Sequence, residues 1–261
     1  MIANQKIAYG SIGWVTWALS EVAANLGSMG IRGIEGFGLN ELMPEDNELK
    51  VKLARLEVSF VGSYFGASMV QKDRWETEVA NFTSTVKSVA ELGGNIVSVG
   101  GGRFYPGLSN QRRSEDWARL IEGAHTFGRI AQQHGVKFGF HPHDHTLVFR
   151  HDDIERFLKD TDPALVGLTF DTAHFGAADM NILDQLKSHF KRIVHVHLKD
   201  EKDGRFLELG RGRLPLKEFL ASLHGGGYNG WITIELDATP DPVASATDSL
   251  AHLLKLLDSL S

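Results

Sequence analysis

The sequence predicts a single-domain (β/α)8 TIM barrel spanning residues 1–261, and three observations favour this fold. Eight short apolar runs alternate with eight longer segments of helical period. No segment rich in Pro, Gly or Ser divides this rhythm. The length is close to the value of about 250 residues that is typical of one barrel. The turn from Ser11 to Trp14 lacks the glycine-rich fingerprint of an open nucleotide-binding sheet, which disfavours that alternative.

Each predicted strand is an apolar run of four to eight residues, as expected for a strand buried in a parallel sheet. The strands are expected at Lys6–Ile12, Gly33–Gly36, Glu57–Tyr64, Asn95–Val99, Lys137–His141, Val166–Asp171, Ile193–Leu198 and Trp231–Leu236. The helices are expected at Leu19–Ser28, Asn47–Leu56, Arg74–Leu92, Glu115–His134, Asp152–Lys159, Ile182–His189, Pro215–His224 and Asp241–Ser259. Gly93 and Gly135 are predicted to end two of these helices, and Ser114 and Asp152 to cap two others.

Composition excludes several classes of protein. The chain has no cysteine, so disulfides, iron–sulfur clusters and thiolate zinc sites are excluded, and a cytoplasmic location is expected. With 27 basic and 33 acidic residues the net charge is −6, so nucleic acid is not expected as a partner. No signal peptide is apparent, and no run approaches the ~18 apolar residues of a membrane span, so no membrane association is expected.

Polar residues gather at the carboxyl ends of the predicted strands, where such barrels place their chemistry. Alternation along strand 193–198 points His195, His197 and Lys199 into the barrel, whereas Val194, Val196 and Leu198 are expected to pack outward. The other polar residues at or just after strand ends are Glu35, His141, His143, His145, Asp171, His174 and Glu235.

Two of these residues, Asp171 and Glu235, indicate a metal centre. Inside a barrel their carboxylates would repel each other unless a cation or a proton lay between them. Two imidazoles and two carboxylates suit Mn²⁺, Co²⁺, Fe²⁺ or Zn²⁺ better than Ca²⁺ or Mg²⁺, and Mn²⁺ is the first choice. The predicted ligands, which come from four consecutive strands, are His141, Asp171, His197 and Glu235.

Three segments carry a family pattern: Phe170 to His174, Arg192 to Asp200, and Gly230 to Glu235. Together they resemble the xylose isomerase-like TIM-barrel superfamily of sugar isomerases, epimerases and dehydratases. The resemblance implies that Asp171, His197 and Glu235 are metal ligands and that His174 contacts the substrate. Within the superfamily, the turn Ile12 to Trp14 and the histidine-rich end of strand 137–141 look most similar to the inosose (2-keto-myo-inositol) dehydratases.

One position departs from the isomerase and epimerase pattern. Those enzymes have a glutamate on the fifth strand that binds the metal and moves a proton, and here the residue is His141. A proton shuttle between two faces of a carbon needs two matched groups, commonly two carboxylates. Elimination from a ketone needs one base for the α-proton and one acid for the departing oxygen. The expected catalytic residues are His143, His145, His174 and Lys199, and the alternative for His143 and His145 is a hydrogen-bonded role in the loop.

The sequence therefore predicts a metal-dependent carbon–oxygen lyase that performs β-elimination on a keto-cyclitol, keto-sugar or keto-glycoside through a metal-stabilised enolate. Glu35, His195 and Arg211 are predicted to bind substrate. The alternative for Glu35 is a structural salt bridge, for His195 a hydrogen-bonded core position, and for Arg211 a contact with another subunit. A homo-oligomer is expected from base rates.

Three other functions compete with the lyase. An isomerase or epimerase of small ketoses is the first alternative. An abasic-site endonuclease needs a basic groove for DNA, which the net charge of −6 disfavours. A non-catalytic sugar-binding or partner-binding barrel would not need Asp171, His197 and Glu235 at its strand ends.

Overall fold

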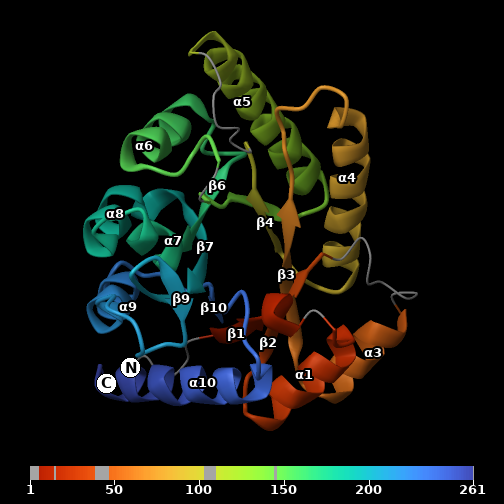
Figure 1. Cartoon of the computed structure of the whole chain (residues 1–261). Coiled ribbons are helices and arrows are strands. Elements are labelled where there is room, and N and C mark those ends of the chain that lie inside the picture. The colour runs from red at the N-terminus through yellow and green to blue at the C-terminus, as the bar shows by residue number, and fades with distance from the viewer. Residues whose placement is uncertain (1–5, 15, 39–46, 103–109, 144–145, 261) are drawn as a thin grey trace.

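The computed structural model describes residues 6–14, 16–38, 47–102, 110–143 and 146–260. Within these ranges, eight parallel strands close into a barrel in the order β1-β10-β7-β6-β5-β4-β3-β2, and helices surround it (Figure 1). The predicted (β/α)8 fold is confirmed. In the described part of the chain, no helix has both the length and the apolar character needed to cross a membrane.

The barrel strands lie close to their predicted positions. They are β1 Lys6–Gly10, β2 Gly33–Phe37, β3 Ser59–Gly66, β4 Ile96–Gly100, β5 Lys137–Phe140, β6 Gly167–Asp171, β7 Ile193–Leu198 and β10 Trp231–Ile234. The largest differences, of two residues, are at the first, third and last strands, and β10 ends at Ile234 where Leu236 was predicted. β1 ends at Gly10 because the chain turns into the 3-10 helix η1, Ser11–Trp14, and β3 begins and ends two residues later than predicted.

Each predicted helix has a counterpart. In the described part of the chain three short helices were not predicted, namely η1, α7 Thr172–Ala177 and η2 Phe190–Arg192. The counterparts are α1 Leu19–Ser28, α3 Asn47–Arg55, α4 Trp75–Glu91, α5 Asn110–Gln133, α6 His151–Asp160, α8 Ile182–His189, α9 Leu216–Gly225 and α10 Pro242–Asp258. Gly93 and Gly135 follow helices with positive φ, as predicted. The predicted caps Ser114 and Asp152 are wrong, because α5 and α6 begin before these residues.

Two apolar clusters fill the molecule. The larger lies between the strands and the surrounding helices. The smaller lies inside the amino-terminal half of the barrel, because it joins residues of five different strands. Its members are Ala8, Val61, Ile96, Val194 and Trp231.

The inward position of Val194 corrects the sequence prediction. The pairing of β6 with β7 shifts between Leu168 and Thr169, so that Leu168 pairs with Ile193 but Thr169 pairs with His195. This irregularity turns Val194 and His195 both toward the barrel interior, and the normal alternation resumes after it. The bulge thus places an apolar floor directly below the polar residues of β7.

A two-stranded antiparallel hairpin, β8 Asp200–Lys202 and β9 Arg205–Leu207, follows β7. Its turn is Asp203-Gly204, and both residues have positive φ. The carboxylate of Asp200 accepts hydrogen bonds from the backbone N–H groups of Gly210 and Gly212, each at 2.9 Å. Asp200 therefore fixes the loop after the hairpin at the carboxyl end of the barrel.

Candidate metal centre

A layer of buried polar residues lies above the apolar floor of the barrel. The hydroxyl groups of Ser98 and Thr169 are 3.0 Å apart. His195 Nε2 lies 3.1 Å from the Thr233 hydroxyl and 2.7 Å from Glu35 Oε2. His195 and Glu35 are 1% and 2% exposed, so this layer supports the residues above it and is closed to solvent.

Glu35 also fixes the orientation of His197. Both of its carboxylate oxygens lie 3.1 Å from His197 Nε2, which donates to them. Burial by itself raises the pKa of Glu35, but His197 and His195 outweigh burial and hold that pKa well below its usual range. Because Nε2 faces Glu35, the other ring nitrogen, Nδ1, points toward the mouth of the barrel.

Asp171 is held by the first turn of α7. Its Oδ1 accepts hydrogen bonds from the backbone N–H groups of Ala173 and His174, at 2.8 and 3.1 Å. This fixes Oδ2 in place, 3.4 Å from His141 Nε2 and 3.9 Å from His197 Nδ1. The fully buried Asp171 thus presents one oxygen to the imidazoles of two neighbouring strands.

These donor atoms fit a divalent transition metal. One ligand atom each from His141, Asp171 and His197 lie within 4.8 Å of one another, and Glu235 Oε2 is 3.3 Å from His197 Nδ1. Among the described residues, His197 Nδ1 is buried without a hydrogen-bond partner although it faces two carboxylates. A buried ring nitrogen in that position has the chemistry of a metal ligand, and the set of two nitrogens and two oxygens agrees with it.

A second group of possible ligands competes with this arrangement. Glu35, His195 and His197 also lie within 4.8 Å of one another. Their donor atoms, however, already hydrogen-bond each other at 2.7 to 3.1 Å. We therefore assign this group to the support of His197, since a carboxylate behind a ligating histidine orients the ring and sets its tautomer.

Lys199 compensates the negative charge of the carboxylates at the mouth of the barrel. Its ammonium lies 2.6 Å from Glu235 Oε1 and 2.5 Å from Asp237 Oδ1, and 3.3 Å from Asp171 Oδ2. Burial lowers the pKa of Lys199, but the three carboxylates outweigh it and raise that pKa well above its ordinary value. In return, Lys199 and His197 hold the pKa of Glu235 below its usual range against the opposite effect of burial. The lysine is therefore a fixed positive charge.

Three histidines line the side of the mouth formed by β5 and α7. The ring centroid of His174 lies 4.1 Å from that of His143 and 5.0 Å from that of His141. Burial lowers the pKa of both His141 and His174, so both rings are neutral at pH 7. Phe206 of the hairpin covers this side, with its ring 4.8 Å from that of His174 and 4.7 Å from the Lys199 ammonium.

The structure thus brings most of the predicted residues together. His145 lies outside the described residues. Arg211 lies apart from the cluster, because its half-exposed guanidinium pairs with Asp248 of α10 at 2.5 Å and with Glu208 at 3.7 Å. The predicted residues that the structure places in one connected cluster are Glu35, His141, His143, Asp171, His174, His195, His197, Lys199 and Glu235.

Sequence reasoning missed two residues of the cluster. Asp237 follows Glu235 by two positions, and this spacing at a strand end could have been noticed as a second carboxylate beside Lys199. Phe206 reaches the site only through the hairpin. The signal for that hairpin is the Asp203-Gly204 dipeptide, which favours a two-residue turn.

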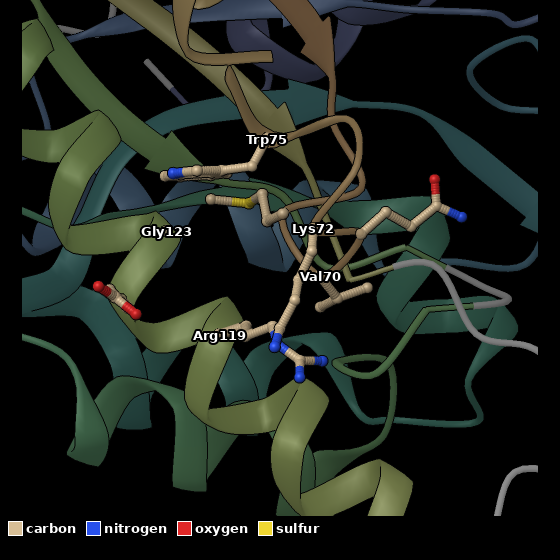
Figure 2. Close-up of a pocket in the computed structure, with 8 residues that line it drawn as sticks. Val70, Lys72, Trp75, Arg119 and Gly123 are labelled. Carbon is tan, nitrogen blue, oxygen red and sulfur yellow. The ribbon is translucent and has the colours of Figure 1, made fainter. Parts of the chain in front are cut away.

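A separate cavity of about 240 Å³ lies outside the barrel, between the segment after β3 and helix α5 (Figure 2). Val70, Lys72, Trp75, Arg119 and Gly123 are among the residues that line it. Its lining residues include a single carboxylate and no histidine. This cavity therefore lacks the histidine–carboxylate cluster that lies at the barrel mouth.

Comparison with known proteins agrees with this arrangement. The model of the family described as "Xylose isomerase-like TIM barrel" matches residues 23–256. A protein named inosose dehydratase from Salmonella typhimurium is 28% identical, over 97% of this chain and 96% of that protein. One of the same name from Bacillus licheniformis is 27% identical, over 88% of this chain and 87% of that protein.

Solved structures show the same fold. A D-tagatose 3-epimerase-like protein superposes with a TM-score of 0.85 at 22% identity, over 98% of both chains. A protein called IOLI, whose crystal structure contains a zinc atom, superposes with a TM-score of 0.83 at 15% identity, over 98% of this chain and 99% of that one.

Proposed function

The chain belongs to the xylose isomerase-like TIM barrel family, and we propose that it is a divalent-metal-dependent lyase that removes water or an alcohol from a keto-cyclitol or keto-sugar. The observation that carries the proposal is the group of imidazoles on the β5 side of the mouth, facing the carboxylates of Asp171 and Glu235. The relatives named inosose dehydratase support a keto-cyclitol as the substrate.

His141, Asp171, His197 and Glu235 would hold the metal. When bound, a divalent cation supplies a Lewis acid that polarises the substrate carbonyl. The donor set suits Mn²⁺, Co²⁺, Fe²⁺ and Zn²⁺, and the expectation of Mn²⁺ is tested by metal analysis of the protein as purified.

We assign the proton transfers to the imidazoles. In the elimination, the bond between the α-carbon and its hydrogen breaks, a carbon–carbon double bond forms, and the β-oxygen leaves as water or an alcohol after taking a proton. His143 is the base in this scheme, because it is partly exposed and its ring lies next to that of His174. His174, held neutral by burial, orients the leaving group, and His145 remains a predicted acid–base residue.

Lys199 acts electrostatically in this scheme. Its raised pKa means that it keeps its proton at neutral pH, so we assign it a hydrogen bond to a developing negative charge. Its contacts with Glu235 and Asp237 hold both carboxylates at the mouth.

Glu35 is a positioning residue in the proposal. It is 2% exposed beneath His197, so the predicted sugar-binding role is replaced by the control of the His197 ring. His195 shares this carboxylate and has the same supporting role.

An isomerase or epimerase of small ketoses is the second candidate. Glu235 favours it, because a carboxylate at this strand end is one of the two groups that a proton shuttle needs. The strand-five position carries His141 in place of the second carboxylate, which favours the lyase.

The test is an assay of the metal-loaded protein with inosose and with a 3-keto-glucoside. The lyase forms an α,β-unsaturated ketone, so absorbance in the near ultraviolet should rise, and the chelator-treated protein should not produce it. If the protein instead interconverts ketoses without a rise in absorbance, the epimerase is the correct function.

A further inference from the structure

A second cluster of side chains that could hold a metal joins α6 and α8. These two helices lie on the outside of the barrel (Figure 1). His151 is the first residue of α6, and Glu155 is one helical turn later on the same face. His189 is the last residue of α8. Two helices thus present three side chains of ligand type to one another.

The geometry of this outer cluster is that of a ligand set. One ligand atom from each side chain lies within 4.8 Å of the other two, and Glu155 Oε1 is 3.6 Å from His189 Nε2. The Gln185 amide lies between the two rings, 2.9 Å from His151 Nδ1 and 3.2 Å from His189 Nε2. Gln185 is 6% exposed and bonds both imidazoles, so it holds the two rings close to each other. A bound ion would replace its hydrogen bond to His189 Nε2, the ring nitrogen that faces Glu155.

Burial is divided unequally in the cluster. His189 is 4% exposed, so its imidazole is held in a buried position. His151 and Glu155 are exposed, so an ion can enter from solvent without any movement of the barrel.

We propose that His151, Glu155 and His189 bind a second transition-metal ion, of the Zn²⁺ class, that links α6 to α8. Two imidazoles and one carboxylate match Zn²⁺ better than Mg²⁺ or Ca²⁺, and water completes the coordination. The cluster shares no residue with the centre in the barrel, and its role is structural, since it joins two helices that pack outside the strands carrying the central donors.

Metal counting on the full-length, chelator-treated protein tests this proposal. Zn²⁺ titration followed by calorimetry should give two ions per chain for the wild type and one for His151→Ala or Glu155→Gln. Both variants change exposed residues, so the proteins are expected to fold and a lower ion count can be attributed to the lost ligand. His224→Ala, which alters an exposed histidine of α9, is the matched control and should keep two ions.

Asp171→Asn separates this inference from the central metal centre. That variant should keep the outer ion, and Asp171→Asn combined with His151→Ala should bind none. Co²⁺ bound to the Asp171→Asn protein should give visible d–d absorption that His151→Ala removes. An unchanged count in His151→Ala and Glu155→Gln, whether the wild type binds two ions or one, would overturn the outer site. Two ions in Asp171→Asn, or a single wild-type ion that His151→Ala removes, would count only against the central one.

Discussion

Within the residues that the structure describes, two histidine–carboxylate clusters differ mainly in burial. In the central cluster, Asp171 and His197 are fully buried, whereas the Glu155 side chain of the outer cluster is 50% exposed. Buried charges must be compensated by neighbours, and the central carboxylates have Lys199 for this purpose. At the outer cluster, water screens the charges. Side chains of similar type are thus held by fixed partners inside the barrel, and outside it we expect them to need a bound ion to join the two helices.

Asp171→Asn should have the largest effect, because it removes a ligand charge while its oxygen can still cap α7. Loss of an outer-sphere partner alone costs about 10- to 100-fold, so loss of this ligand should reduce kcat/KM and metal affinity by more than about 100-fold. Steady-state enone formation and metal content measure the change. Asp248→Asn, at an exposed carboxylate, is the control, and wild-type metal content in Asp171→Asn would refute the assignment.

Glu35→Gln should have the second largest effect and weaken metal binding by about 10- to 100-fold. The amide no longer accepts hydrogen bonds from both imidazoles as the carboxylate does. Glu78→Gln is a matched control, since Glu78 is equally buried but bonds the backbone N–H groups of Ser68 and Met69. Competition with a chelating dye measures the affinity. Equal losses in the two variants would mean that Glu35 is merely structural.

Metal affinity should also depend on pH through His197. Burial lowers the pKa of this imidazole, but Glu35 and Glu235 outweigh burial and raise the pKa to about 9. The metal must displace that proton, so affinity should rise by about tenfold per pH unit up to pH 9. In the metal-free protein the same proton adds stability that is fully present below the unfolded-state pKa of about 6.5 and is lost as the pH rises through 9.

Calorimetry from pH 6.5 to pH 9 in buffers of different ionisation enthalpy checks this linkage. One proton should be released for each central ion below pH 9. The Asp171→Asn protein, which keeps only the outer ion, should not show this release from His197. Affinity of the central ion that is independent of pH would contradict the linkage.

Phe206→Ala should have a smaller effect, because it removes the ring that covers His174 and Lys199 but leaves the proposed ligands unchanged. We expect the ring to cover bound substrate as well, and a contact of this kind contributes about 1 kcal/mol, so KM should rise by about fivefold with metal affinity unchanged. Leu207→Ala in the same strand of the hairpin is the control. Unchanged KM in Phe206→Ala would place Phe206 outside the substrate site.

Arg211→Ala should have the smallest effect. Its ion pairs with Asp248 and Glu208 are exposed, so the free energy of unfolding should fall by less than about 1 kcal/mol and the activity should stay within about twofold of the wild type. Urea unfolding and steady-state kinetics measure both. A large rise in KM would restore Arg211 as the substrate-binding residue that the sequence predicts.

The strand order and the residues of the mouth could be predicted because both follow from periodicity. A regular strand–helix rhythm fixes which strand ends are neighbours, so Asp171, His197 and Glu235 were expected to lie together. The orientation of Val194 could not be predicted, because a bulge interrupts alternation without any signal in the residues themselves.

The roles of Glu35 and Arg211 depend on long-range contacts that periodicity does not contain. Glu35 contacts His197, which lies on another strand of the barrel and 162 positions later in the sequence. Arg211 pairs with Asp248, 37 positions later in the sequence. The pair forms because the Asp200 carboxylate fixes the path of the loop that carries Arg211. Tertiary packing decides such pairs.

The most direct test of the central cluster is an anomalous difference map from a crystal of the protein loaded with Mn²⁺. The account predicts a peak bonded to His197 Nδ1 and Asp171 Oδ2, with Glu235 and His141 completing the protein ligands. A peak on the opposite side of the His197 ring, between Glu35 and His195, or no peak inside the barrel, would contradict it.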